Sequence, residues 1–98
     1  MKPLPKKIKF AGFTYKVKMT DDLDGGDSWG RTMLGKQEIY IERGLSIEKQ
    51  WETLIHEMLH VALRHTTGLK EFKDEREEDV TRAWSMNIFG ILKQNDII

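Results

Sequence analysis

The chain has 98 residues, of which 39% are hydrophobic and 33% charged, a length and composition typical of one soluble domain. Sixteen basic residues balance sixteen acidic ones, so no net field draws the chain to nucleic acid or a membrane, and we expect neither partner. The absence of cysteine excludes disulfides, thiolate metal sites and cysteine nucleophiles. No stretch resembles a signal peptide or a membrane span, which favours a cytoplasmic protein.

The beginning of the chain carries the pattern of β-strands. Apolar and polar residues alternate over residues 6–19, and Gly12 lies near a turn. Side chains of a strand point to alternate faces, so this period of two predicts a hairpin with one buried face. Residues 20–28 are rich in Asp and Gly and predict a solvated loop.

Two further strands are expected before the first helix. Residues 29–34 are the weaker candidate, and residues 37–42 predict a strand with Ile39 and Ile41 facing inward and Tyr40 facing outward. Short connections favour antiparallel neighbours, so we expect a small antiparallel sheet of three to four strands within residues 1–45.

Two helices are expected to follow, over residues 46–68 and 74–95. Ser46 is a suitable N-cap for the first helix. Its apolar stripe comprises Trp51, Leu54, Ile55, Met58, Leu59 and Ala62. The second helix is expected to bury Val80, Ala83, Trp84, Ile88, Ile91 and Leu92. We interpret Trp29, Trp51 and Trp84 as core residues. Strands followed by helices on one face of a sheet predict a single α+β domain over residues 1–98.

His56-Glu57-Met58-Leu59-His60 form the pattern H-E-x-x-H on the first helix. Residues four apart lie one turn above each other, so both imidazoles can bind one metal ion without distorting the backbone. Glu57 is placed to accept a proton from a metal-bound water rather than to join the ligands. Imidazole and carboxylate ligands suit zinc, and we expect one Zn²⁺ per chain.

A third protein ligand must come from another segment, because two histidines make a weak site. His65 lies five residues beyond His60 and is expected near the helix C-terminus, pointing away from the pair. Glu77 precedes Val80 by three residues, which places it on the expected inward face of the second helix and favours it as the ligand. Glu78 is the main alternative ligand, and Glu77 could instead cap the helix.

The sequence resembles the small zincin metallopeptidases of the gluzincin type, most closely the minimal ones that bacteriophages and mobile elements often encode. The resemblance rests on Thr-Leu-Ile-His-Glu-Met-Leu-His-Val at residues 53–61 and on Glu-Glu-Asp-Val-Thr-Arg-Ala-Trp at residues 77–84. It implies a minimal zincin-like fold. It also implies a zinc site with His56, His60 and Glu77 as ligands and Glu57 as the general base.

The resemblance also implies where a substrate lies. Zincins bind a peptide antiparallel to the edge strand before the motif helix, which implicates Ile39, Tyr40 and Ile41 through backbone pairing. Many larger relatives add a downstream Tyr or His that stabilises the oxyanion, and no Tyr or His occurs in residues 66–98. Arg82 is a candidate for that role.

The expected function is therefore a zinc-dependent, endopeptidase-like hydrolase acting on a protein or peptide. A metal-bound water would attack the peptide bond, with Glu57 as general base. The alternative is a zinc-stabilised binding or regulatory module that keeps the zincin fold with weak or no catalysis. The sequence indicates neither the identity of the substrate nor the oligomeric state.

Overall fold

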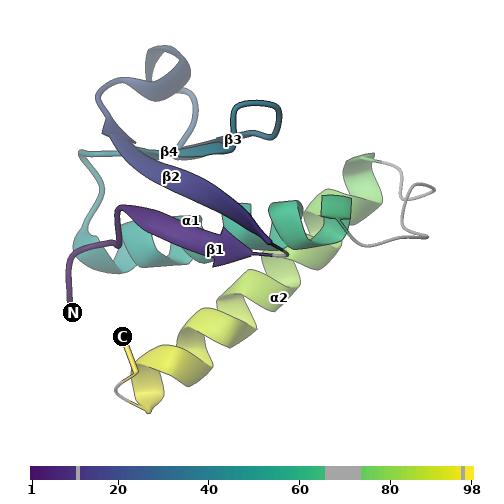
Figure 1. Ribbon diagram of the computed structural model, residues 1–98. Helices are drawn as coiled ribbons and strands as arrows, with labels where there is room; N and C mark the ends of the chain where they lie inside the picture. Colours follow the sequence, from purple (N-terminus) through teal and green to yellow (C-terminus); the bar gives the residue numbers. More distant parts are fainter. Residues whose placement is uncertain (11, 66–73, 96) are drawn as a thin grey trace.

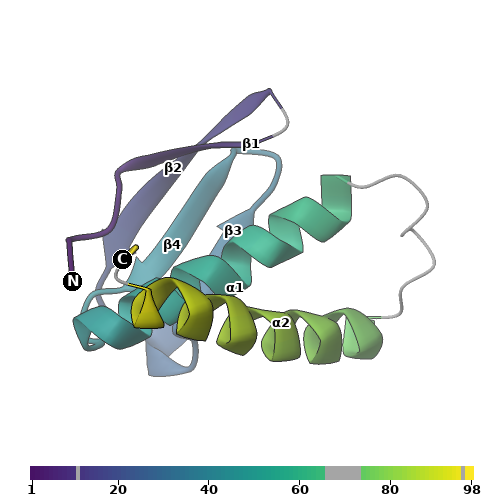
Figure 2. The same cartoon turned by 90° about the horizontal axis from the view of Figure 1, so that it is seen from below.

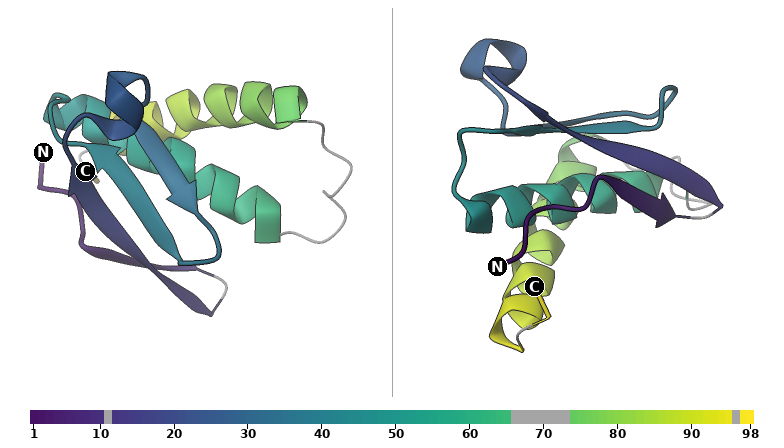
Figure 3. Two further views of the ribbon diagram at one scale, coloured as in Figure 1. Left: turned by 90° about the horizontal axis from the view of Figure 1, so that it is seen from above. Right: turned by 60° about the vertical axis from the view of Figure 1, so that its left-hand side comes forward.

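Four strands and two long helices make up the fold in the computed structural model (Figure 1), which describes residues 1–10, 12–65, 74–95 and 97–98. In chain order the elements are β1 (Lys7–Phe10), β2 (Phe13–Thr20), the short 3-10 helix η1 (Leu23–Gly26), β3 (Gly30–Met33), β4 (Glu38–Glu42), α1 (Ile47–His65) and α2 (Asp74–Gln94). Both helices lie on one side of the sheet (Figure 3), which confirms the predicted α+β class.

The sheet is mixed, with the strand order β1-β2-β4-β3. The predicted hairpin forms, because β1 pairs antiparallel with β2, and the next two strands in the chain, β3 and β4, are also antiparallel neighbours. The prediction of a wholly antiparallel sheet is wrong at its centre, where β2 and β4 run parallel. The loop after β2 carries the chain to the outer edge, so β3 lies at that edge and β4 returns between β3 and β2.

The core lies between the inner face of the sheet and α1. Tyr15 and Val17 of β2 lie beside Ile39 and Ile41 of β4, as the period of two predicted, and they pack against a helix residue, Leu54. Because Ile39 and Ile41 are 1% and 0% exposed, β4 is anchored in the core by both of its inward side chains.

α1 begins where the sequence predicted. The Lys49 backbone N–H donates to Ser46 Oγ at 3.2 Å, which confirms Ser46 as the N-cap. Leu54 packs against the sheet, Ile55 is also buried, and His65 is the last residue of α1. The predicted end at Gly68 lies outside the described residues.

α2 packs against α1, as the view from below shows (Figure 2), and the predicted buried face is only partly correct, because Val80, Ile88 and Leu92 are half-buried but Ala83 is exposed. Thr81 and Ser85 are 0% and 1% exposed, whereas Trp84 is 61% exposed. The small side chains of Thr81 and Ser85, one turn apart, allow α1 and α2 to pack closely. A large side chain such as that of Trp84 would hold the helices further apart. Trp29 is also exposed, at 54%, so two of the three tryptophans are not core residues. Neither helix, over its described residues, has an apolar run sufficient to cross a bilayer.

Candidate metal centre

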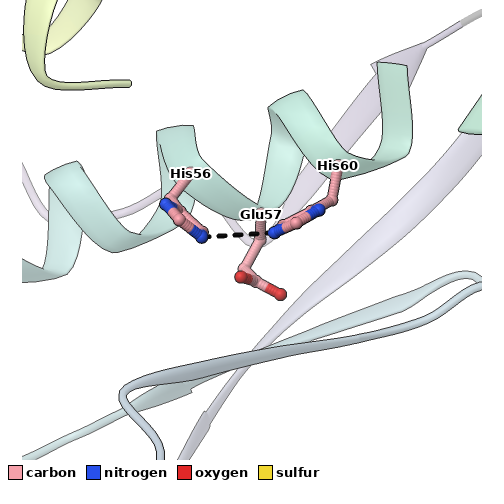
Figure 4. A group of neighbouring side chains, drawn as sticks. All are labelled: His56, Glu57 and His60. Atoms are coloured by element: carbon pink, nitrogen blue, oxygen red, sulfur yellow. Dashed lines mark hydrogen bonds between the residues drawn. The ribbon is translucent and has the colours of Figure 1, made fainter. Parts of the chain in front are cut away.

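His56 and His60 converge from successive turns of α1 (Figure 4). Their Nε2 atoms are 3.2 Å apart, and the ring centroids are separated by 4.9 Å. Both side chains are about one-fifth exposed, at 22% and 21%, so they lie at the boundary between core and solvent as predicted. The four-residue spacing on a regular helix is sufficient to explain this arrangement.

A carboxylate from α2 meets the pair, and it belongs to Glu78. Its Oε1 is 2.9 Å from Nε2 of His56, and its Oε2 is 3.1 Å from Nε2 of His60. The predicted ligand Glu77 lies within α2, but its side chain is outside what the structure describes. Glu78, the alternative considered from the sequence, is therefore the α2 carboxylate that lies at the histidines among the side chains that the structure describes.

These three donors fit a zinc ion. In tetrahedral coordination with bonds of 2.0–2.1 Å, neighbouring donor atoms are about 3.3 Å apart. The two Nε2 atoms are 3.2 Å apart, which is close to that value, and each lies 2.9 or 3.1 Å from a different oxygen of Glu78, so the three side chains are close enough to share one ion. Two imidazoles and one carboxylate are a common donor set of catalytic zinc, in which a fourth position is left for water.

The Glu57 side chain extends toward the sheet from between the two histidines (Figure 4), and its carboxylate lies within 4.8 Å of their ligand atoms, so it belongs to the same possible metal-binding group. It is only 8% exposed, and it accepts a hydrogen bond of 2.9 Å from Thr32 Oγ1. Burial raises the pKa of the Glu57 carboxyl above its usual value, while the Thr32 hydrogen bond and the nearby imidazoles oppose that rise. A raised pKa suits a general base that works near neutral pH.

A cleft opens on each side of Glu57. The larger has a volume of about 600 Å³, and its walls include Trp29, Gly30, His56, Glu78, Arg82 and Met86. The smaller, of about 200 Å³, is lined by Thr32, Leu34, Glu57, His60 and Arg64. A ligand that crossed Glu57 from one cleft to the other would therefore pass directly over the candidate metal site.

The strand predicted to pair with a substrate is not at the sheet edge. β4, which contains Ile39, Tyr40 and Ile41, is hydrogen-bonded to β2 on one side and to β3 on the other. Its backbone groups are already used, so the prediction that these residues bind a peptide by backbone pairing is wrong. The edge beside the site is β3 instead.

Two residues of β3 that the sequence did not indicate as site residues lie against Glu57. Thr32 donates to Glu57, and Gly30 leaves room for the close approach of β3 to α1. A Cβ on Gly30 would lie 2.6 Å from Thr53 Cγ2 and 3.1 Å from Glu57 Cγ. An isolated glycine within a strand pattern is the one sequence signal of such an approach, and Thr32 has no comparable signal.

Gly30→Ala should therefore destabilise the protein, because the new methyl group would push β3 away from α1. We expect a loss of about 1–3 kcal/mol in the free energy of unfolding, measured by urea denaturation. Gly35→Ala is the matched control, since nothing lies within 4 Å of a Cβ at that position. Equal unfolding midpoints for the two variants would contradict the close packing of β3 on α1.

Comparison of the chain with protein-family models, curated proteins and solved structures finds no match.

Proposed function

We propose that the protein is a zinc-dependent peptidase-like hydrolase. The observation that carries the proposal is the convergence of His56, His60 and Glu78 with a second, buried carboxylate, Glu57, within 4.8 Å of the histidine ligand atoms. A structural zinc site would need no second carboxylate beside its ligands. A hydrolytic site needs one, because the attacking water must lose a proton.

Each residue would have a distinct task. His56, His60 and Glu78 would hold the zinc, which when bound supplies a Lewis acid for the scissile carbonyl and lowers the pKa of a coordinated water. Glu57 would accept the proton of the attacking water and pass it to the leaving amine. Arg82 lines the larger cleft one helical turn beyond Glu78, which favours it as a donor to the oxyanion.

The substrate that fits this arrangement is an extended peptide. β3 is an edge strand, and a peptide can extend a sheet by pairing with such a strand. A peptide lying along β3 would pass over Glu57, with its side chains in the two clefts. The scissile bond would then lie beside the zinc ligands.

Metal removal tests the proposal. Purified protein should contain one zinc per chain and should cleave members of a mixed peptide library, detected by mass spectrometry. A chelator should stop cleavage, and stoichiometric zinc should restore it, because the ligands are preformed on two helices. Zinc binding without cleavage of any peptide would contradict the peptidase proposal.

A second candidate function is a zinc-stabilised binding module. It is favoured by the absence of any Tyr or His in residues 66–98, which removes the oxyanion donors that such sites often use. The coordination of the loaded protein distinguishes the two. A fourth protein ligand favours the module, whereas three protein ligands and an open position favour the hydrolase.

A further inference from the structure

β3 presents two different surfaces to the candidate site. Side chains at alternate positions of a strand share a face, so Gly30 and Thr32 both lie on the face directed at α1. Thr32 Oγ1 donates to Glu57 Oε1 at 2.9 Å, and Gly30 lets the backbone come close enough for that bond. The face of β3 directed at α1 therefore contacts and positions the Glu57 carboxylate.

The backbone of the same two residues faces the open edge of the sheet. The Glu42 N–H donates to the Trp29 carbonyl at 2.8 Å, and in this register Glu42 is opposite Trp29. Hydrogen-bonded and non-hydrogen-bonded pairs alternate along an antiparallel ladder, so Arg31 and Met33 also bond to β4. Gly30 and Thr32 consequently direct their N–H and C=O groups away from β4, toward an added strand.

We infer that Thr32 is a positioning residue for Glu57 and that it links peptide binding on β3 to the orientation of the base. This inference rests on the proposed hydrolase function. The Thr32 hydroxyl fixes one carboxylate oxygen of Glu57 and leaves the other available for a proton. A peptide paired with the Thr32 backbone would be held in fixed register with that carboxylate.

The geometry limits how the carboxylate can move. Glu57 is held by the hydroxyl of Thr32, and Gly30 lies close beside it. A Cβ added at Gly30 would lie 3.1 Å from Glu57 Cγ. Without the hydroxyl, rotation about the side-chain bonds of Glu57 would no longer be opposed by a hydrogen bond. The loss should therefore affect proton transfer more than peptide binding, which uses the backbone of β3.

The test compares Thr32→Val with Thr32→Ser in zinc-loaded protein, using a peptide that the wild type cleaves. Valine keeps the shape and suits a strand, whereas serine keeps the hydroxyl. We expect Thr32→Val to lower kcat by about 10- to 100-fold with little change in KM or zinc content. Thr32→Ser should recover most of the activity. Thr32→Val should add little to the loss caused by Glu57→Gln, because both act through the same proton transfer.

Thr14→Val is the matched control, because Thr14 is an exposed strand threonine of β2, remote from β3 in the sheet order. Its activity should equal that of the wild type. A second readout does not depend on turnover. In metal-free protein, Thr32→Val should lower the thermal midpoint when Glu57 is present, and should lower it less in a Glu57→Ala background.

Four outcomes would overturn the inference. Wild-type kcat in Thr32→Val would remove it while leaving the hydrolase function intact. Equal losses in the valine and serine variants, or equal thermal shifts with and without Glu57, would show that the hydroxyl is not the cause. Absence of any zinc-dependent cleavage by the wild type would remove the proposed function, and this inference with it. Thr32→Ala replaces valine if circular dichroism shows that Thr32→Val is unfolded.

Discussion

Glu57→Gln should retain zinc and lose hydrolysis. The amide has the shape of the carboxylate and can still accept the Thr32 hydrogen bond, but it cannot take a proton from water. Because positioned general bases contribute about 10²- to 10⁴-fold to rate, we expect kcat to fall by that range. Turnover of a cleaved library peptide and zinc content by mass spectrometry are the two measurements.

The stability of this variant provides the control. Burial raises the pKa of the Glu57 carboxyl, which means that the folded protein disfavours its ionised form. A neutral amide removes that cost, so the thermal midpoint of Glu57→Gln should not be lower than that of the wild type. Unchanged turnover in a folded, zinc-loaded variant would rule out Glu57 as the base.

Replacing the α2 carboxylate should weaken zinc binding far more at Glu78 than at Glu77. Glu78 contacts both histidines, so Glu78→Gln removes the carboxylate of the proposed third ligand. Substituting a residue that hydrogen-bonds to a metal ligand lowers metal affinity by about 10- to 100-fold. Loss of a ligand itself should lower the affinity by more than the upper end of that range. Competition with a chromophoric chelator measures the affinity.

Glu77→Gln is an almost ideal comparison for this prediction. The two variants lose the same charge from neighbouring positions of one helix, so the difference between them reports position alone. We expect zinc affinity in Glu77→Gln to remain within a few-fold of the wild type. A larger loss at Glu77 than at Glu78 would restore the assignment made from the sequence and overturn the one made from the fold.

The sequence favoured Glu77 over Glu78 as the metal ligand from α2. Counting back from Val80 and Trp84 placed Glu77 on the inward face, on the assumption that large apolar residues are buried. In the fold, α2 turns Thr81 and Ser85 toward α1. The same count, three residues back from Thr81 and seven from Ser85, leads to Glu78. The side chain of Glu77 lies outside the described residues, so its assignment as a ligand stays a prediction, whereas Glu78 is seen beside the histidines.

The substrate edge was misassigned for a different reason. The sequence predicted each strand and the hairpin of β1 and β2, since these follow from alternation and short turns. It could not indicate that β4 would lie between β2 and β3, because that order depends on where a loop leads the chain. As a result the edge strand beside Glu57 is β3. The contacts of Gly30 and Thr32 with Glu57 follow from that position and could not be predicted either.

The sequence by itself determined the α+β class, the start of α1 at Ser46 and the pairing of His56 with His60. These features depend on local periodicity, because a helix turns every 3.6 residues whatever surrounds it. Tertiary structure decided which carboxylate reaches the histidines, which strand forms the edge and what holds Glu57. Those contacts join segments distant in sequence, and close packing between elements selects them.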